Sequence, residues 1–560
     1  MQAKLFSVRT ANDLVDVPQT PSPMTSIDRH YVAHPQRWLV LILLLYGLVA
    51  IRFALLTPAW QAPDEPAHYN YIATIATQHA LPVLKMGDYD QDLLNQLLST
   101  HFDPRLPVAN LRYESYQPPL YYLLATPVFW LSKENLLALR LLNVLFGAIA
   151  ILLLYCCLVL VLPTKPLLSL GAAAFAASLP MHVAVMAAVN NDVLAEVWVL
   201  AALLVLLQWI RRQFYTLATS MQKTNSHGQL IVLGLLLGLG LLTKLYAYIL
   251  APISVLMIVL VLWRNQRTWR SVLQGIYAAL WVMIPAGLLG LPMWWRNAQL
   301  YGVRDLLGLG WHDRVVVGQP RTLDWILQKG LVAYGERALD FTFKSFWGVF
   351  GWMGVFMDER IYMALLFFTG VLFLGLLWAL VRLISGSPDT DMDEFQSWAL
   401  GLFGLIFLAA IASYAWYNVK FVQHQGRYFF WALLAISTFV ALGWREVMQP
   451  LQGVIAGFLA LVLGGSLALM ELASGNLNKW NVFTLVLIAL FLLCQPLLLG
   501  GVNDYPVRSL PVGMRKFMTK PSIARVLTLL RFCAWATPFA LLFLLDLLIP
   551  QLYIAPQLMP

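Results

Sequence analysis

The chain has 560 residues, of which 60% are hydrophobic and only 12% are charged. This composition excludes a soluble enzyme and indicates a protein that crosses the membrane many times. The net charge of +9 does not indicate nucleic-acid binding, because the basic residues lie in short loops between apolar runs.

The N-terminus is polar and carries several prolines, so we predict that residues 1–36 form a disordered cytoplasmic tail. Thirteen apolar runs follow, each about long enough to cross a hydrocarbon layer of ~30 Å. The first run is not followed by a cleavage pattern and is expected to remain as an anchor. The predicted spans lie near 38–56, 139–162, 167–188, 192–210, 229–243, 245–263, 272–293, 361–381, 397–415, 428–444, 451–471, 481–500 and 526–549.

The segment 118–131 is also apolar, but it is short, begins with two prolines and is rich in aromatic residues. We place it on the outer surface, because counting it as a span would remove the excess of Lys and Arg from the inner loops. The unusual polar segments then all face outward, namely loop 57–138, the turn 190–192, Lys244, loop 294–360 and the stretch 418–427.

The sequence Pro-Asp-Glu-Pro-Ala-His at 63–68 follows the first span. Pro66 is typical of a first helical turn, so a helix is expected to run to about residue 79. Asp64, Glu65 and His68 would share one flank of this helix, and a carboxylate there could act as a general base. Alternatively, the acids simply favour the positive end of the helix dipole, or Glu65 and His68 contribute to an incomplete site for a divalent cation.

The apolar residues of the same helix predict a face that lies in the membrane interface; they are Ala67, Tyr71, Ile72 and Ile75. The double proline at 118–119 predicts an extended entry into an aromatic segment whose Tyr rings lie at headgroup depth. Before it, Glu114 and Gln117 are the better candidates for contacts with a polar ligand.

Four charged residues lie close to membrane depth: Arg140, Asp192, Lys244 and Arg427. Burial of a charge there costs about 2.5–3.5 kcal/mol, so each needs a partner or a function. They could pair internally, for instance Arg140 with Asp192. Alternatively, the three cations could bind the phosphate of a lipid headgroup and stabilise it as a leaving group.

Loop 294–360 is rich in tryptophan, with Trp294, Trp295, Trp347 and Trp352. Tryptophan faces can stack on sugar rings, but an aromatic belt at the membrane interface is the more common arrangement, and we favour it.

These motifs, taken in order, resemble the C-type (GT-C) glycosyltransferases, which use polyprenyl-phosphate sugars. The resemblance rests on Pro-Asp-Glu-x-x-His at 63–68, Gln-Pro-Pro-Leu-Tyr-Tyr at 117–122 and Asn-Asp at 191–192. Further motifs are Leu-Thr-Lys at 242–244, Trp-Trp-Arg-Asn at 294–297 and Gln-Gly-Arg-Tyr at 425–428. Among these enzymes, the motifs resemble those of a bacterial group related to the protein mannosyltransferases (family 39) and to the aminoarabinose transferases.

The resemblance implies an all-α fold with about thirteen transmembrane helices and amphipathic helices in the first outer loop. It implies Asp64 as catalytic base or acceptor-positioning acid, with Glu65 as its rival and Asp192 as a second acid. Lys244, Arg140 and Arg427 would hold the donor phosphate. His68, Glu114, Gln117 and Tyr428 are expected to contact the acceptor or the sugar, although His68 has no assured counterpart in the family.

We therefore expect an inverting sugar transferase with a polyprenyl-phosphate-linked donor and an acceptor hydroxyl on a lipid, glycan or protein. The predicted location is a bacterial inner membrane, with the site facing the periplasm. Residues 37–430 would form the catalytic module and residues 431–560 additional helices. The alternatives are a transporter or flippase of lipid-linked sugars and a non-catalytic assembly partner. No cofactor is certain, and a divalent metal cation is left open.

Overall fold

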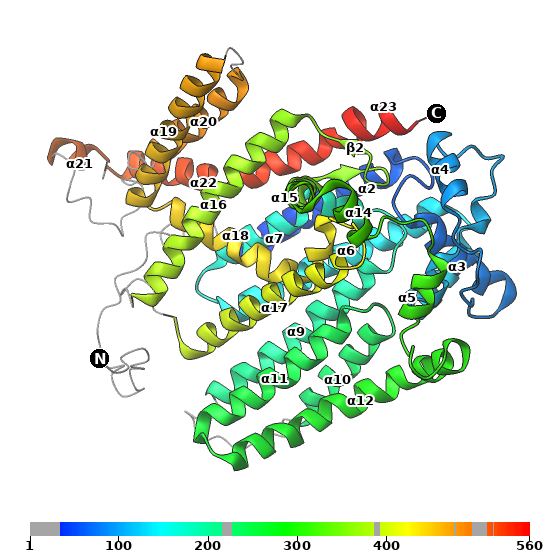
Figure 1. The fold of residues 1–560 in the computed structure, drawn as a ribbon. Coiled ribbons are helices and arrows are strands. Elements are labelled where there is room, and N and C mark those ends of the chain that lie inside the picture. Colours follow the sequence, from blue (N-terminus) through cyan, green and yellow to red (C-terminus); the bar gives the residue numbers. More distant parts are fainter. Residues whose placement is uncertain are drawn as a thin grey trace.

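The computed structural model describes residues 34–215, 227–385, 392–474, 478–494, 512–518 and 520–559. Nearly all of the predicted tail 1–36 lies outside this set, as do residues 495–500 of the predicted span 481–500. The described chain is almost entirely helical (Figure 1). A short antiparallel ribbon joins β1 (Val349–Phe350) to β2 (Val355–Phe356).

Each of the thirteen predicted spans corresponds to a helix or a bent helix pair. Ten spans are long and apolar enough to cross a membrane. They are α2 (Pro35–Leu56), α6 (Leu136–Val161), α9 (Asp192–Tyr215), α11 (Ala247–Gln266), α12 (Trp269–Tyr301), α16 (Glu359–Ile384), α17 (Glu394–Asn418), η5 (Gly426–Ala432) continuing into α18 (Leu433–Val447), α19 (Pro450–Ser474), and α22 (Pro521–Ile549) continuing into η7 (Pro550–Ile554) and α23 (Ala555–Leu558).

The remaining three spans are irregular or short. Helices α7 (Pro166–Ala177) and α8 (Pro180–Met186) bend by 65° at their junction. Helices α10 (His227–Leu241) and α20 (Lys479–Leu493) are apolar but have only 15 residues each. The predicted all-α polytopic membrane architecture is confirmed.

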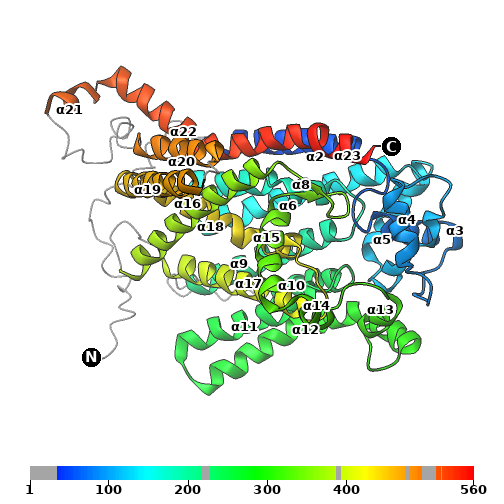
Figure 2. The same cartoon turned by 45° about the horizontal axis from the view of Figure 1, so that its top comes forward.

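The two long loops that were predicted to face outward fold into short helices, and Figures 1 and 2 place α3, α4 and α5 of the first loop at one end of the bundle. They contain α3 (Glu65–Gln78), α4 (Gln91–Ser99), η2 (Val108–Asn110), η3 (Tyr113–Tyr116), α5 (Leu120–Leu131), α13 (Leu309–Val315), α14 (Thr322–Lys329) and α15 (Leu331–Trp347). A further short helix, α21 (Val512–Met518), precedes α22.

The two loops contact each other directly. The indole of Trp352 donates to the Trp60 carbonyl at 2.9 Å, and that of Trp311 donates to the Leu84 carbonyl at 2.8 Å. The first loop is therefore held between the membrane helices and the second loop.

The predicted helix after Pro63 is confirmed as α3, but its apolar face does not lie in the membrane interface. Tyr71 and Ile72 are buried, and they pack against α5. Tyr121 and Tyr122 of α5 are also fully buried, so these rings are covered by protein and do not face lipid headgroups. The physical reason is that the two short helices cover each other's apolar faces and so remove both from water.

The second long loop begins later than predicted, because α12 continues to Tyr301. Trp294 therefore lies on a helix, where its indole donates to the Tyr248 hydroxyl at 2.7 Å. Trp295 is exposed, whereas Trp347 is buried in the core. These tryptophans thus do not form a single continuous row.

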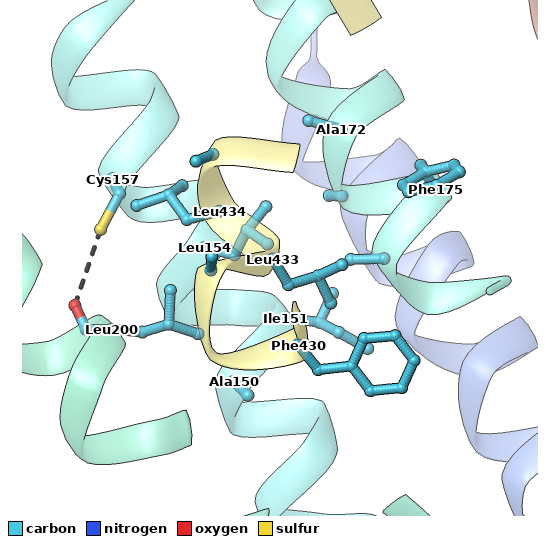
Figure 3. Close-up of a cluster of buried hydrophobic side chains, with 14 of the residues drawn as sticks. Ala150, Ile151, Leu154, Cys157, Ala172, Phe175, Leu200, Phe430, Leu433 and Leu434 are labelled. Atoms are coloured by element: carbon cyan, nitrogen blue, oxygen red, sulfur yellow. Dashed lines mark hydrogen bonds between the residues drawn. The ribbon is translucent and has the colours of Figure 1, made fainter. Parts of the chain in front are cut away.

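The core beneath the outer end surrounds η5 and the start of α18 (Figure 3). Phe430, Leu433 and Leu434 lie among apolar side chains of α6, α7 and α9. The thiol of Cys157 on α6 contacts the Leu200 carbonyl on α9 at 3.7 Å. Because η5 also contains Arg427, this packing fixes where that guanidinium emerges.

Helices α16 and α18 approach each other through glycines. A Cβ atom added to Gly375 would fall on the Gly443 carbonyl, and one added to Gly443 would fall on the Leu372 carbonyl. Small residues at such a crossing permit close backbone packing in membrane proteins.

We expect Gly375→Ala to destabilise the fold by about 1–3 kcal/mol, because overpacking must push α16 away from α18. Thermal unfolding of the detergent-solubilised protein measures this effect. Gly370→Ala on the same helix is the matched control, since its Cβ would meet nothing within 4 Å. Equal melting temperatures for the two variants would contradict the prediction.

Candidate functional site

Asp64 joins the first outer loop to η5. It precedes α3 with φ 66°, a left-handed conformation that is uncommon for residues other than glycine. Its Oδ2 atom lies 2.9 Å from Nη2 of Arg427, and its Oδ1 accepts a hydrogen bond of 2.8 Å from the Tyr113 hydroxyl. The Arg427 Nε donates to Gln425 at 2.6 Å, so the guanidinium is held from both sides.

A second ion pair connects the start of α9 with the loop between α10 and α11. Lys244 Nζ lies 3.0 Å from Asp192 Oδ1 and donates to Asn191 at 2.8 Å. The Tyr246 hydroxyl also donates to Asp192 Oδ1, at 3.0 Å. The charge of Arg427 acts on Asp192 as well as on Asp64, so the two pairs form one cluster.

Glu65 and Arg140 form a separate, fully buried pair. Arg140 donates from Nε and Nη2 to the two carboxylate oxygens of Glu65, at 2.8 and 2.6 Å. Its other three N–H groups reach the carbonyls of Ala54, Thr57 and Pro58. All five donors of the guanidinium are therefore used within the protein.

This arrangement differs from the sequence expectations in two ways. The internal partner of Arg140 is Glu65, not Asp192, because Asp192 pairs with Lys244. Glu65 also leaves the flank that it was expected to share with Asp64 and points into the bundle, with 0% of its side chain exposed.

His68 is buried on α3, where its Nδ1 atom lies 2.9 Å from the Tyr122 hydroxyl. Burial lowers the pKa of His68 to about 3, and the charge of Lys244 acts in the same direction. The imidazole is therefore neutral at physiological pH. Within the described residues, no group of three or more His, Cys, Asp or Glu side chains could hold a metal ion.

Glu114 and Gln117 lie on and just after η3, and both are buried. The amide of Gln117 donates to the Tyr116 hydroxyl at 3.1 Å and accepts from Asn191 at 3.4 Å. The Oε2 atom of Glu114 is buried and has no hydrogen-bond partner in the described part of the chain. Tyr428 lies beside Arg427, whose guanidinium is 5.7 Å from its ring centre.

The pKa values of Asp64 and Glu114, two acids of the first long loop, shift in opposite directions. Burial would raise the pKa of Asp64, but the charge of Arg427 and hydrogen bonds from Arg427 and Tyr113 outweigh burial and lower it. Burial raises the pKa of Glu114 to about 7, and the negative charge of Asp64 adds to this effect. Asp64 is therefore an anion near neutral pH, whereas Glu114 is close to its titration point.

A cavity opens beside the Arg427 and Arg140 side chains. Arg427 and Arg140 contribute its basic wall, together with Gln61 from the first loop. Met181 and Val185 of α8 and Ile554 of η7 contribute apolar wall. The cavity thus combines cationic side chains with an apolar surface at the end of the membrane bundle.

The structure pairs Asp64 with Arg427 and Asp192 with Lys244, so all four of these predicted site residues form ion pairs. Sequence reasoning missed the supporting contacts made by Tyr113, Tyr246 and Gln425. Two of these contacts could have been found from position alone, because Tyr246 lies two residues after Lys244 and Gln425 lies two residues before Arg427.

Residues 116–289 match the model of a protein family described as dolichyl-phosphate-mannose-protein mannosyltransferase. This match confirms the resemblance to the C-type glycosyltransferases that the motifs indicated. The matched segment includes Arg140, Asp192 and Lys244, whereas Asp64 precedes it and Arg427 follows it. No curated protein matches the chain.

The likeness to solved structures is weak. The apo oligosaccharyltransferase of Archaeoglobus fulgidus has 15% identity and a TM-score of 0.43, over 82% of this chain and 54% of that one. This chain therefore spans about half the length of that protein. ArnT from Cupriavidus metallidurans bound to undecaprenyl phosphate has 13% identity and a TM-score of 0.40, over 91% of this chain and 77% of that one. Scores of this size assign neither a residue role nor an activity.

Removing either member of the Glu65–Arg140 pair should destabilise the protein by about 3–5 kcal/mol, since the other charge would stay buried without its partner. We expect Glu65→Gln and Arg140→Met to lower the melting temperature in detergent. Asp103→Asn is the control, because Asp103 pairs with an Arg105 side chain that is 88% exposed. Wild-type melting of Glu65→Gln would contradict a structural role.

Because the pKa of Glu114 is raised from 4.5 to about 7, its contribution to stability is present below pH 4.5 and is lost as the pH rises through 7. The glutamine in Glu114→Gln does not titrate. The melting temperature of this variant, relative to that of the wild type, should therefore rise by about 1–3 °C between pH 5 and pH 8. Thermal unfolding across this range tests the prediction. Parallel curves for the two proteins would refute it.

Proposed function

We propose that this protein transfers a sugar from a polyprenyl-phosphate-linked donor to an acceptor hydroxyl, with inversion, at the extracytoplasmic face of a bacterial inner membrane. The observation that carries the proposal is the partly buried cluster of two acids and two cations, Asp64 with Arg427 and Asp192 with Lys244. The cluster borders a cavity that has both a basic and an apolar wall.

The cavity suits a phosphate attached to a long hydrocarbon. Arg427 lines it and donates through Nε to Gln425 and through Nη2 to Asp64. A guanidinium can bind two phosphate oxygens at once, and its charge stabilises a departing phosphate. Lys244 has three N–H donors, of which Asn191 and Asp192 engage two. The α8 side of the cavity offers an apolar surface to the lipid.

Asp64 acts as the anion that orients Arg427 and the acceptor. Its lowered pKa keeps it charged while it holds the guanidinium at 2.9 Å. Asp192 plays the same role for Lys244. Arg140 is a positioning residue in this proposal, because its five donors are engaged by Glu65 and three carbonyls.

The orientation follows from the charges at the two ends of α9. This helix of 24 residues begins with Asp192 at the cluster and carries Arg211 and Arg212 near its other end. Arg264 lies at the C-terminal end of α11, in the last turn. Basic residues collect on the cytoplasmic side of membrane proteins, so the cluster faces the opposite, outer side.

The first test is transfer of radiolabelled sugar from polyprenyl phosphates to a membrane extract by the purified protein in lipid. We expect Asp64→Asn to lower turnover by about 10²-fold or more, because Arg427 loses its counter-charge and its orientation. Asp324→Asn should keep wild-type turnover, since Asp324 is exposed on α14.

Two results would contradict the proposal. Wild-type turnover by a folded Asp64→Asn protein would remove the ion pair from the reaction. Binding of the lipid-linked sugar without transfer, equal in wild type and variant, would favour a transporter or flippase instead.

A further inference from the structure

Glu114 is an acid near the cluster of Asp64, Arg427, Asp192 and Lys244, and one of its carboxylate oxygens lacks a partner among the described residues. Asp64 contacts Arg427 and Tyr113, and Asp192 contacts Lys244 and Tyr246. By contrast, the Oε2 atom of Glu114 is shielded from solvent and has no hydrogen-bond partner among the residues that the structure describes. An unpaired buried acceptor costs about 1–3 kcal/mol or more, so its retention calls for an explanation.

The backbone around Glu114 is held firmly. The Gln117 N–H donates to the Glu114 carbonyl at 3.0 Å, and the Ser115 N–H donates to the Arg112 carbonyl at 2.9 Å. The Tyr71 hydroxyl donates to the Gln117 carbonyl at 3.1 Å, which ties the turn to α3. Glu114 is 9% exposed, so the turn holds its carboxylate inside the protein.

The surroundings of Glu114 leave its carboxyl group partly protonated at neutral pH. Burial has the largest effect and raises its pKa, and the negative charges of Asp64 and Asp192 act in the same direction. Lys244 and the amide of Gln117 lower it, and the resulting value is about 7. The nearby phenols belong to Tyr116, Tyr122 and Tyr417, which are neutral at this pH. A general base is most effective when its pKa lies near the working pH.

A second, smaller cavity lies beside the turn that carries Glu114, although Glu114 itself does not line it. Its wall includes Tyr116, Gln117 and Asn297. The Oδ1 atom of Asn297 is a second buried acceptor without a partner in the described residues. An unpaired acceptor in the wall of this cavity suits a ligand that brings an O–H donor, and an acceptor hydroxyl is such a ligand.

We propose that Glu114 is the general base of the transfer reaction, which makes this inference dependent on the proposed function. As the acceptor oxygen forms a bond to the anomeric carbon, its proton passes to the Glu114 carboxylate. The bond between the anomeric carbon and the phosphate oxygen breaks, and its electron pair leaves with the phosphate beside Arg427. The charge balances, because one carboxylate is neutralised and one phosphate gains the negative charge.

The test compares wild type with Glu114→Gln, which keeps the size of the side chain, and with Glu114→Asp. We expect kcat to fall on the order of 10²–10⁴-fold in Glu114→Gln and to recover in part in Glu114→Asp. Binding of polyprenyl phosphate should stay within about twofold of wild type. Glu134→Gln is the matched control, since Glu134 is exposed after α5 and should keep full activity.

The pH profile separates a catalytic role from a structural one. Wild-type kcat/KM should fall tenfold for each unit of acidification below pH ~7, and this limb should be absent from the residual activity of Glu114→Gln. Infrared difference spectra give a readout without turnover, in which the wild type, but not Glu114→Gln, loses a carboxylic acid band on titration through pH 7.

Wild-type kcat and an unchanged acidic limb in Glu114→Gln would overturn the role of Glu114 and leave the proposed function standing. The absence of the carboxylic acid band in the wild-type titration would overturn it as well. If the wild type transfers no sugar while it binds the lipid-linked donor, the proposed function itself fails.

Discussion

The Glu65–Arg140 ion pair is the constraint on which the outer end of the protein depends. Arg140 projects from α6 and engages both oxygens of Glu65 at the start of α3. It also binds the carbonyls of Ala54 and Thr57 at the end of α2, while Glu65 accepts from the Val189 N–H near the start of α9. One buried pair therefore fastens three segments of the bundle to the first outer loop. Because the pair is buried, loss of either partner would leave an uncompensated charge inside the protein and destabilise it.

The adjacent acids Asp64 and Glu65 consequently have different roles. Glu65 points into the bundle, whereas Asp64, in a left-handed conformation, turns toward Tyr113 and Arg427. The anchored pair holds the backbone of residue 64 in place, and strain of this kind is tolerated where the surroundings determine the conformation. The ion pair with Arg427 can then form across a separation of more than 300 residues, because the core around Phe430 positions η5 independently.

The break between α7 and α8 positions the start of α9 at the site. A bend frees backbone carbonyls within the membrane, and they must find donors inside the protein. The Ala176 carbonyl accepts from His182 Nδ1 at 2.9 Å, and the opposite ring nitrogen lies 3.1 Å from Glu196 on α9. A carbonyl at the 65° bend thus finds its donor inside the protein, and the chain beyond the bend brings Asn191 and Asp192 to Lys244.

The sequence by itself determined the spans, the side on which the polar segments gather and the candidate cluster residues, because hydropathy and charge are properties of single segments. Only the tertiary structure decided which charges pair. Asp64 and Glu65 are neighbours in a motif, yet the backbone conformation sends them to different arginines. Likewise, the sequences of α3 and α5, taken separately, predict apolar faces that contact the membrane. The packing of the two helices against each other buries Tyr71 and Tyr122 instead. Partner choice and burial depend on contacts between distant segments, which local patterns do not encode.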